Sequence, residues 1–315
     1  MLIGTRRTRV IAGSFAASTV LLVSAAWAEL AGGDARMEHP VREITTAERE
    51  LLQTAEQMLV QSCMQQQGFR YWPVDRHPIP EYREFPYVVD DVNWARTYGY
   101  GAELERRMKE MDASSPNKKY VAALTPDRRR QWLQTYHGSG SGWLKAKLPR
   151  GGVLSHSDAG CASKAQRLLY QDLQGWYQAR ESAIDRKGLK QDRVVADDRF
   201  AASTEQWARC MRRSGHAYTS PADIREALEK TSLRTEPKQQ VTLAVAEAVC
   251  AEESGLARTS RKLDRHYAEV LAGQYRADTD LKLRLEREAL PRAQEMVRQA
   301  TDSGLSPERS PSSSP

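Results

Sequence analysis

The sequence predicts a mainly α fold: two unequal helical halves with signs of duplication, each with a disulfide-stapled helix pair, plus one small β-hairpin. The first observation is a motif that occurs twice, in SCMQQQGFRYWP (62–73) and RCMRRSGHAYTSP (209–221). Four residue types recur at the same offsets in the two copies: Cys63, Met64, Gly68 and Tyr71, then Cys210, Met211, Gly215 and Tyr218. The second observation is the spacing of three and four between apolar residues, which indicates amphipathic helices. The third is an even number of cysteines, four in all.

The composition is that of a well-solvated globular protein. The chain has 315 residues, enough for one large domain or two ordinary ones, and 40% of them are hydrophobic and 28% charged. The formal net charge is +6, and loss of residues 1–28 would remove three arginines and no acid, which leaves +3. A positive charge this small argues against nucleic acid as a partner.

Residues 1–28 have the order of a secretory signal peptide. TRRTR (5–9) is positive, residues 10–28 carry no charge, and the run ends in Ala26-Trp27-Ala28, a small-x-small cleavage site. The uncharged run is also long enough for an uncleaved membrane anchor. A linker over 29–44 follows. We therefore expect a secreted or extracytoplasmic protein, with anchoring by an uncleaved N-terminal helix as the alternative.

The four cysteines predict two disulfides in an exported chain. Cys63 and Cys210 lie in the repeated motif, whereas Cys161 and Cys250 each begin a Cys-Ala pair in another helical run. The motif cysteines and the Cys-Ala cysteines alternate along the chain. One disulfide in each half would therefore pair Cys63 with Cys161 and Cys210 with Cys250. Each bond would stabilise the fold by about 4–5 kcal/mol in the chain-entropy model.

The cysteines have two alternative roles, as metal ligands or as a catalytic thiol. A metal site would need Cys-x-x-Cys or His-x3-His spacing, which the sequence does not contain, so neither a metal nor a cofactor is expected. A catalytic thiol would need a base close in space, which spacing alone leaves open.

The first half is expected over residues 45–190. The capping box Thr45-x-x-Glu48 begins a helix that Gly68 ends. The apolar face of this helix is expected to be Leu51, Leu52, Ala55, Met58, Leu59 and Cys63. Residues 69–101, the aromatic loop, contain four prolines and predict extended chain with a short helix near 91–98.

Three further helices and the hairpin complete this half. The helices are predicted over 102–112, 116–124 and 126–136, and Ser115-Pro116 and Thr125-Pro126 supply a cap residue followed by proline. Residues 143–157 alternate apolar and polar around Pro-Arg-Gly-Gly, which predicts a hairpin. Ser157 or Asp158 is then expected to cap the helix of Cys161.

The second half is expected over residues 191–302. Its predicted helices are 196–214, which ends at Gly215, a short one in SPADIREALEK, and 236–300 with breaks at Gly255 and Pro291. Residues 303–315 have the composition of a disordered tail.

No catalytic residues are assigned from motifs. SHSD (155–158) holds the residue types of a hydrolase triad, but adjacent residues cannot converge as nucleophile, base and orienter. Asp90-Asp91 and Asp197-Asp198 each precede a helix, where acids bind free amides, so they are interpreted as caps.

The aromatic loop is the candidate binding surface. Six large aromatic side chains lie within about thirty residues: Trp72, Tyr82, Tyr87, Trp94, Tyr98 and Tyr100. Such residues either cover a helical core or offer rigid, amphipathic contact area to a sugar or a peptide. We expect Trp94 in the core, and Tyr82 and Tyr87 exposed because they lie among charges and prolines.

The paired Cys-Met-x-x-x-Gly helix ends, the YWPV and VDDVNWARTYGYG segments and the late GLARTSRKLDRHYAEVLAGQYR run resemble uncharacterised exported helical proteins of actinobacteria. The resemblance covers most of the mature chain and carries no functional residues. The sequence thus predicts an exported protein with a binding or cell-envelope role, whose partner would be an envelope polymer or protein. The alternatives are an exported hydrolase with scattered catalytic residues and a membrane-anchored structural protein.

Overall fold

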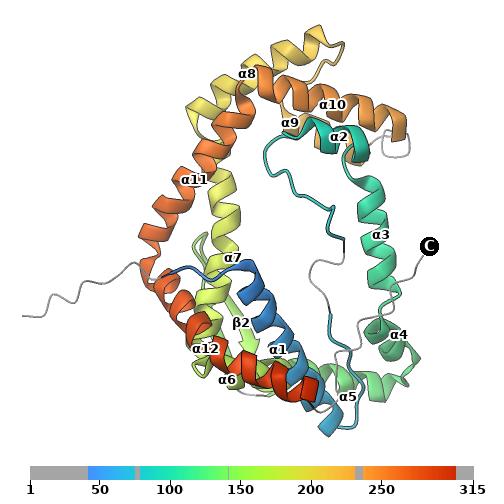
Figure 1. Ribbon diagram of the computed structural model, residues 1–315, viewed down its shortest axis with the longest axis vertical. Helices are drawn as coiled ribbons and strands as arrows, with labels where there is room; N and C mark the ends of the chain where they lie inside the picture. The colour runs from blue at the N-terminus through green and yellow to red at the C-terminus, as the bar shows by residue number, and fades with distance from the viewer. Residues whose placement is uncertain (1–41, 75–78, 141, 231–236, 303–315) are drawn as a thin grey trace, which may run out of the picture. The chain divides into compact units, whose positions relative to one another are not determined.

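A computed structural model describes residues 42–74, 79–140, 142–230 and 237–302. Within these ranges the chain is mostly helical with one antiparallel hairpin, which confirms the predicted fold class (Figure 1). The helices are α1 (Thr46–Gln66), α2 (Val92–Tyr98), α3 (Ala102–Ala113), α4 (Pro116–Ala123), α5 (Pro126–His137), α6 (Cys161–Tyr170), α7 (Leu173–Val195), α8 (Asp198–Arg213), α9 (Pro221–Lys230), α10 (Pro237–Glu253), α11 (Leu256–Gln274) and α12 (Arg276–Asp302). The strands are β1 (Trp143–Lys147) and β2 (Val153–Ser157), which pair from Trp143↔Ser157 to Lys147↔Val153.

Some predictions lie outside the described residues. These are the signal peptide or anchor over 1–28, the linker up to residue 41, and the tail over 303–315. None of the helices in the described ranges combines the length and the apolarity that a membrane crossing requires.

The repeated motif ends two helices in the same way. Gly68 and Gly215 have φ of 75° and 83°, in the left-handed region that glycine adopts without strain. One residue later, Phe69 N donates to Met64 O and His216 N donates to Met211 O, each at 2.9 Å. These bonds span five residues and satisfy carbonyls at the helix end, as in a Schellman motif. The prediction that the motif stops a helix is confirmed in both copies.

The predicted disulfide pairing is also confirmed. Cys63 is bonded to Cys161 and Cys210 to Cys250, with sequence separations of 98 and 40 residues. The first bond lies in a hydrophobic cluster with Trp132, and the second lies in a separate cluster. All four cysteines are therefore paired, which indicates an oxidising environment.

One core is enclosed by α1, α6, α7 and α12. α1 packs against α6 and α12, and α12 packs against α7 (Figure 1). Leu169 and Ala289 are fully buried in it, and Tyr170 stacks on Trp176 with ring centroids 3.6 Å apart. The first described helix is thus held by the last one.

A second core is enclosed by α8, α9, α10 and α11. Trp207 is fully buried there, and its Nε1 donates to the backbone O of Glu247 at 3.3 Å. α7 packs against α11 and also contributes Val194 to this core. α7 runs without interruption through residue 190. No break in the helix marks the predicted boundary between the halves at 190/191, so that boundary stays a prediction.

Two glutamine side chains of α7 hydrogen-bond the hairpin. Lys145 N donates to Gln174 Oε1 at 3.1 Å, and Gln174 Nε2 donates to Lys145 O at 2.7 Å. Gln178 makes the same two bonds with Lys147, at 2.8 and 3.1 Å. The amides of two residues one turn apart therefore bond the edge of β1 as a third strand would.

The predicted cap of α6 by Ser157 or Asp158 is wrong. The N-cap is Gly160, with φ 92° and no side-chain cap bond. Ser157 instead accepts a bond from Ser163 Oγ at its carbonyl oxygen, at 2.7 Å. A Cβ on Gly160 would lie 2.3 Å from Gly138 N, so two chain segments cross backbone to backbone where only glycine fits.

The predicted break at Gly255 is confirmed, since φ is 78° there and α11 begins at the next residue. The predicted break at Pro291 is wrong, because α12 continues through it. Leu290 and Ala293 beside this proline are buried in the first core, and that packing outweighs the lost hydrogen bond. The helical run is interrupted instead at Tyr275, between α11 and α12. The Tyr275 hydroxyl donates to Pro149 O in the hairpin turn at 3.2 Å.

Candidate binding site

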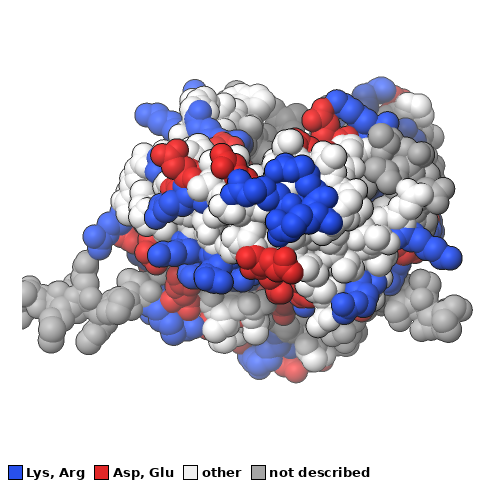
Figure 2. All heavy atoms as spheres, turned by 90° about the horizontal axis from the view of Figure 1, so that it is seen from above, with Lys and Arg blue, Asp and Glu red and all other residues white. Residues whose placement is uncertain are grey.

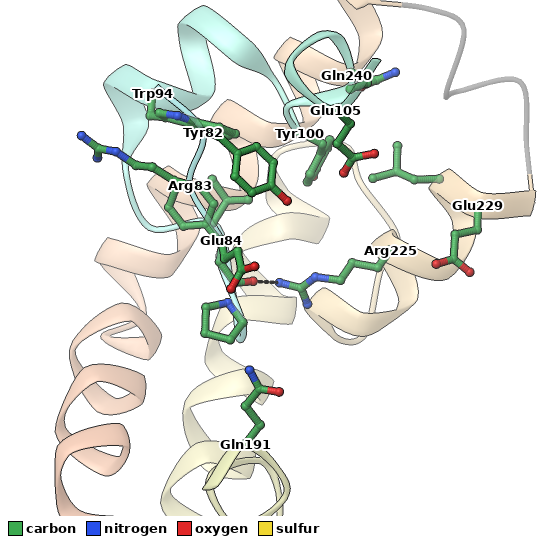
Figure 3. A pocket seen from close by; sticks show the side chains of 15 residues that line it. Tyr82, Arg83, Glu84, Trp94, Tyr100, Glu105, Gln191, Arg225, Glu229 and Gln240 are labelled. Carbon is green, nitrogen blue, oxygen red and sulfur yellow. Dashed lines mark hydrogen bonds between the residues drawn. The ribbon is translucent and has the colours of Figure 1, made fainter. Parts of the chain in front are cut away.

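A cavity of about 440 Å³ lies between the aromatic loop, α9, the start of α10 and the end of α7 (Figure 3). We call it the Arg225 pocket. Its polar and charged lining side chains are Arg83, Glu84, Glu105, Gln191, Arg225, Glu229 and Gln240, and its aromatic ones are Tyr82, Phe85, Trp94 and Tyr100. The volume falls at the lower end of the range typical of ligand sites, about 300–1,000 Å³.

The start of α2 positions the outer wall. Asp91 is the N-cap, and its Oδ1 accepts from Trp94 N at 2.9 Å. This local cap confirms the sequence interpretation of Asp91. Trp94 is buried with 6% of its surface exposed, its Nε1 donates to Glu81 O at 2.9 Å, and its ring packs 4.8 Å from that of Phe85. The segment before α2 is therefore folded back onto the helix.

Arg225 of α9 holds the loop from the other side. Its Nη2 donates to Phe85 O at 2.8 Å and its Nη1 to Tyr87 O at 3.3 Å. These carbonyls belong to an irregular segment that has no strand or helix partner for them, so the guanidinium satisfies them. Arg225 thus fixes the backbone of the loop and brings a positive charge to the pocket wall.

A buried carboxyl lies beneath the same segment. Glu247 of α10 has 1% of its surface exposed; Oε1 accepts from Val89 N at 2.9 Å and Oε2 from the Tyr100 hydroxyl at 2.7 Å. Burial raises the pKa of Glu247, and the two bonds and the charge of Arg225 oppose this rise only in part. Burial and the neighbouring Glu247 in turn raise the pKa of Tyr100.

A third attachment joins the loop to α11. The Tyr87 hydroxyl donates to Asp264 Oδ1 at 2.6 Å, and Lys190 Nζ donates to Asp264 Oδ2 at 2.8 Å. The Tyr87 ring packs on Phe200 with centroids 6.2 Å apart. Side chains from α9, α10 and α11 therefore fix the loop between residues 85 and 100 at several points.

The structure divides the six predicted aromatic residues into two groups. Tyr82, Trp94 and Tyr100 line the Arg225 pocket. The others do not: Trp72 packs against Tyr120, Tyr87 lies in the second core, and Tyr98 packs on Trp94. The expected burial of Trp94 is confirmed, and Tyr82 is half-buried. The expected exposure of Tyr87 is wrong, since it has 7% of its surface exposed, because its hydroxyl has a partner inside the protein.

Sequence reasoning missed the residues that α9 and α10 contribute. Glu247 could have been found, because it is the one charged residue in the apolar run LAVAEAVCA (243–251), and a buried acid needs partners. Arg225 and Glu229 carry no such signal, since charged residues on a short amphipathic helix normally face solvent.

The chemistry of the pocket suits binding. Its lining contains carboxylates, amides, aromatic rings and Arg225, but no Ser, Cys or His among the described residues. Burial raises the pKa of Tyr82, and the nearby carboxylates Glu105 and Glu84 raise it further, which indicates a negative potential on that side. The SHSD segment lies elsewhere, in β2 and the turn after it, where His156 Nδ1 is 2.7 Å from Ser157 O.

The surface around this end of the fold mixes charges of both signs. Figure 2 shows Lys and Arg side chains among Asp and Glu side chains over the face in view. Arg199 pairs with Asp197 at 2.8 Å, and Arg261 pairs with Asp90. Such pairs of opposite charge reduce any long-range electrostatic field from this surface.

Comparison of the chain with protein-family models, with curated proteins and with solved structures finds no significant match.

Proposed function

We propose that the protein is an exported, disulfide-stabilised binding protein that takes up a cell-envelope component in the Arg225 pocket. The observation that carries this proposal is the pocket itself, a cavity whose wall combines aromatic rings with charged and amide side chains (Figure 3). Its aromatic wall belongs to the segment that the second copy of the motif lacks, since TSPADIREAL follows Tyr218 directly. A segment present in one copy only is where a duplicated scaffold acquires a specialised surface.

Export is supported by two independent features. Residues 1–28 have the order of a signal peptide, and the two disulfides are of the kind that persists outside the reducing cytoplasm. N-terminal sequencing of the mature protein separates secretion from anchoring by an uncleaved segment, because only cleavage places Glu29 at the new N-terminus.

The pocket is tested by calorimetric titration of the oxidised protein with a defined panel of neutral oligosaccharides and short peptides. Tyr82 is half-buried and lines the pocket, and its hydroxyl has no hydrogen-bond partner among the described residues. Tyr82→Ala should therefore weaken binding by about tenfold or more, and it should lower the melting temperature only by the loss of its packing on Trp94 and Leu104.

Trp143→Ala is the matched control. Trp143 is an aromatic residue on the hairpin with 57% of its surface exposed, outside the pocket. Its replacement should change neither affinity nor stability. Equal losses of affinity in both variants, or no binding by any compound of the panel, would contradict the proposed function.

A further inference from the structure

Arg225 keeps hydrogen-bonding capacity toward the pocket. A guanidinium carries five N–H donors, and the two bonds to the carbonyls of Phe85 and Tyr87 use two of them. A carbonyl oxygen brings no formal charge, so these bonds leave the positive charge of Arg225 in the pocket wall. Guanidinium groups bind carboxylates through two parallel, charge-assisted bonds, so this wall favours a ligand carboxylate.

Carboxylates lie around the same cavity. Glu229 follows Arg225 by one helical turn on α9, and Glu84 comes from the loop opposite (Figure 3). Both are exposed, and within the described ranges neither has a hydrogen-bond or ion-pair partner. They are therefore available to bind an amine, and they lie on either side of the Arg225 side chain in Figure 3.

Apolar side chains complete the lining of the cavity. Phe85, Val89 and Leu228 line it together with the charged groups. A volume of about 440 Å³ accommodates a small ligand and not a folded partner.

We propose that the ligand of the Arg225 pocket is a short zwitterionic peptide, a deduction that rests on the proposed function. Its carboxylate binds Arg225, its side-chain amine binds Glu229, and an apolar residue between them packs on Leu228. A polyanion is disfavoured, because three carboxylates and two arginines line the same cavity. A neutral sugar would offer none of these charges an opposite charge.

The probe is N-acetyl-Lys-Phe-Ala, which carries one amine and one carboxylate with an apolar residue between them. Two derivatives each remove one charge: the C-terminal amide and the peptide with an acetylated lysine side chain. Calorimetric titration of the oxidised full protein should show a loss of affinity of about tenfold or more for each derivative, since charge-assisted bonds are lost. Equal affinity for all three peptides would overturn the proposal.

Glu229→Gln and Glu226→Gln form a matched pair of variants on α9. Glu226 is exposed, pairs with Lys230 and does not line the pocket. Glu229→Gln should lower the affinity for the parent peptide about fivefold or more. Its affinity for the acetyl-lysine derivative should equal that of the unmodified protein. Glu226→Gln should leave both affinities unchanged. Equal losses of affinity in the two variants would show that the peptide responds to the overall charge of α9 and not to a contact with Glu229, which would overturn the proposal.

A neutral trisaccharide, tri-N-acetylchitotriose, separates failure of this proposal from failure of the proposed function. Binding of the trisaccharide that is lost in Tyr82→Ala, with no binding of the peptide, would overturn the zwitterionic ligand and leave the pocket as a binding site. Absence of binding by both probes, in the presence of an intact fold by circular dichroism, would overturn both.

Discussion

Glu247 connects the aromatic loop to the second core through its carboxyl group. Val89 N and the Tyr100 hydroxyl both donate to it, and the residue is almost completely buried. Loss of the carboxyl would leave both donors without an acceptor, so Glu247→Ala should cost about 3 kcal/mol or more. Glu247→Gln keeps the shape and one acceptor, so the free energy of unfolding should change much less.

The raised pKa of Glu247 predicts a pH dependence of stability. The folded state holds this proton more tightly than the unfolded state, where the pKa is about 4.3. Its contribution to stability is therefore complete below that value and decreases as the pH rises toward the folded-state pKa. Denaturant unfolding from pH 4 to 8 should show a loss of stability with rising pH that Glu247→Gln diminishes.

Glu252→Gln on the same helix is the control, because Glu252 is exposed. Its pH profile should match that of the unmodified protein. Coincident profiles for all three proteins would show that Glu247 has the same pKa in the folded and unfolded states, which would contradict the prediction.

At the scale of elements, the helix ends were predictable where their causes are local. Thr45, Ser115 and Thr125 cap the helices that the sequence assigned to them, because each cap bond reaches only three residues along the chain. The start of α6 and the break at Tyr275 were not predictable. Gly160 depends on a crossing with Gly138, and no local sequence pattern encodes a contact between distant segments.

The attachment of β1 to α7 gives a prediction at this scale. Gln174→Ala removes an acceptor for Lys145 N and a donor for Lys145 O, so it should destabilise the protein by about 1–2 kcal/mol. Hydrogen exchange at the Lys145 amide should accelerate, because that group becomes open to water. The Lys147 amide, which Gln178 holds, is the internal control and should keep its protection. Unchanged exchange at Lys145 would show that the glutamine bond contributes nothing.

At the scale of the whole molecule, the two disulfides should differ in their effect on stability. The chain-entropy model gives about 4.7 kcal/mol for the 98-residue separation and about 4 kcal/mol for the 40-residue separation. Replacing Cys63 and Cys161 by Ser should therefore lower the free energy of unfolding more than replacing Cys210 and Cys250. Guanidinium denaturation of the two double variants measures this order. The opposite order would mean that local packing, and not loop closure, decides the stabilisation.

The Arg225 pocket shows how far sequence reasoning extends to the whole molecule. Tyr82, Trp94 and Tyr100 of its wall were predictable, because they lie close together in the chain. The lining residues of α9 and α10 lie more than a hundred residues further on, and Arg225 joins the loop only through backbone carbonyls. Any residue provides such carbonyls, so the loop sequence contains no sign of its partner.

The packing of α1 against α12 has a consequence for the order of events during synthesis. About 210 residues of chain separate the end of α1 from the start of α12. At translation rates of 5–20 residues per second, α1 waits on the order of 10–40 s for the helix that covers it. During that interval Leu52 and Ala55 face no finished core, so the nascent chain exposes the apolar face of α1, a surface of the kind that chaperones bind.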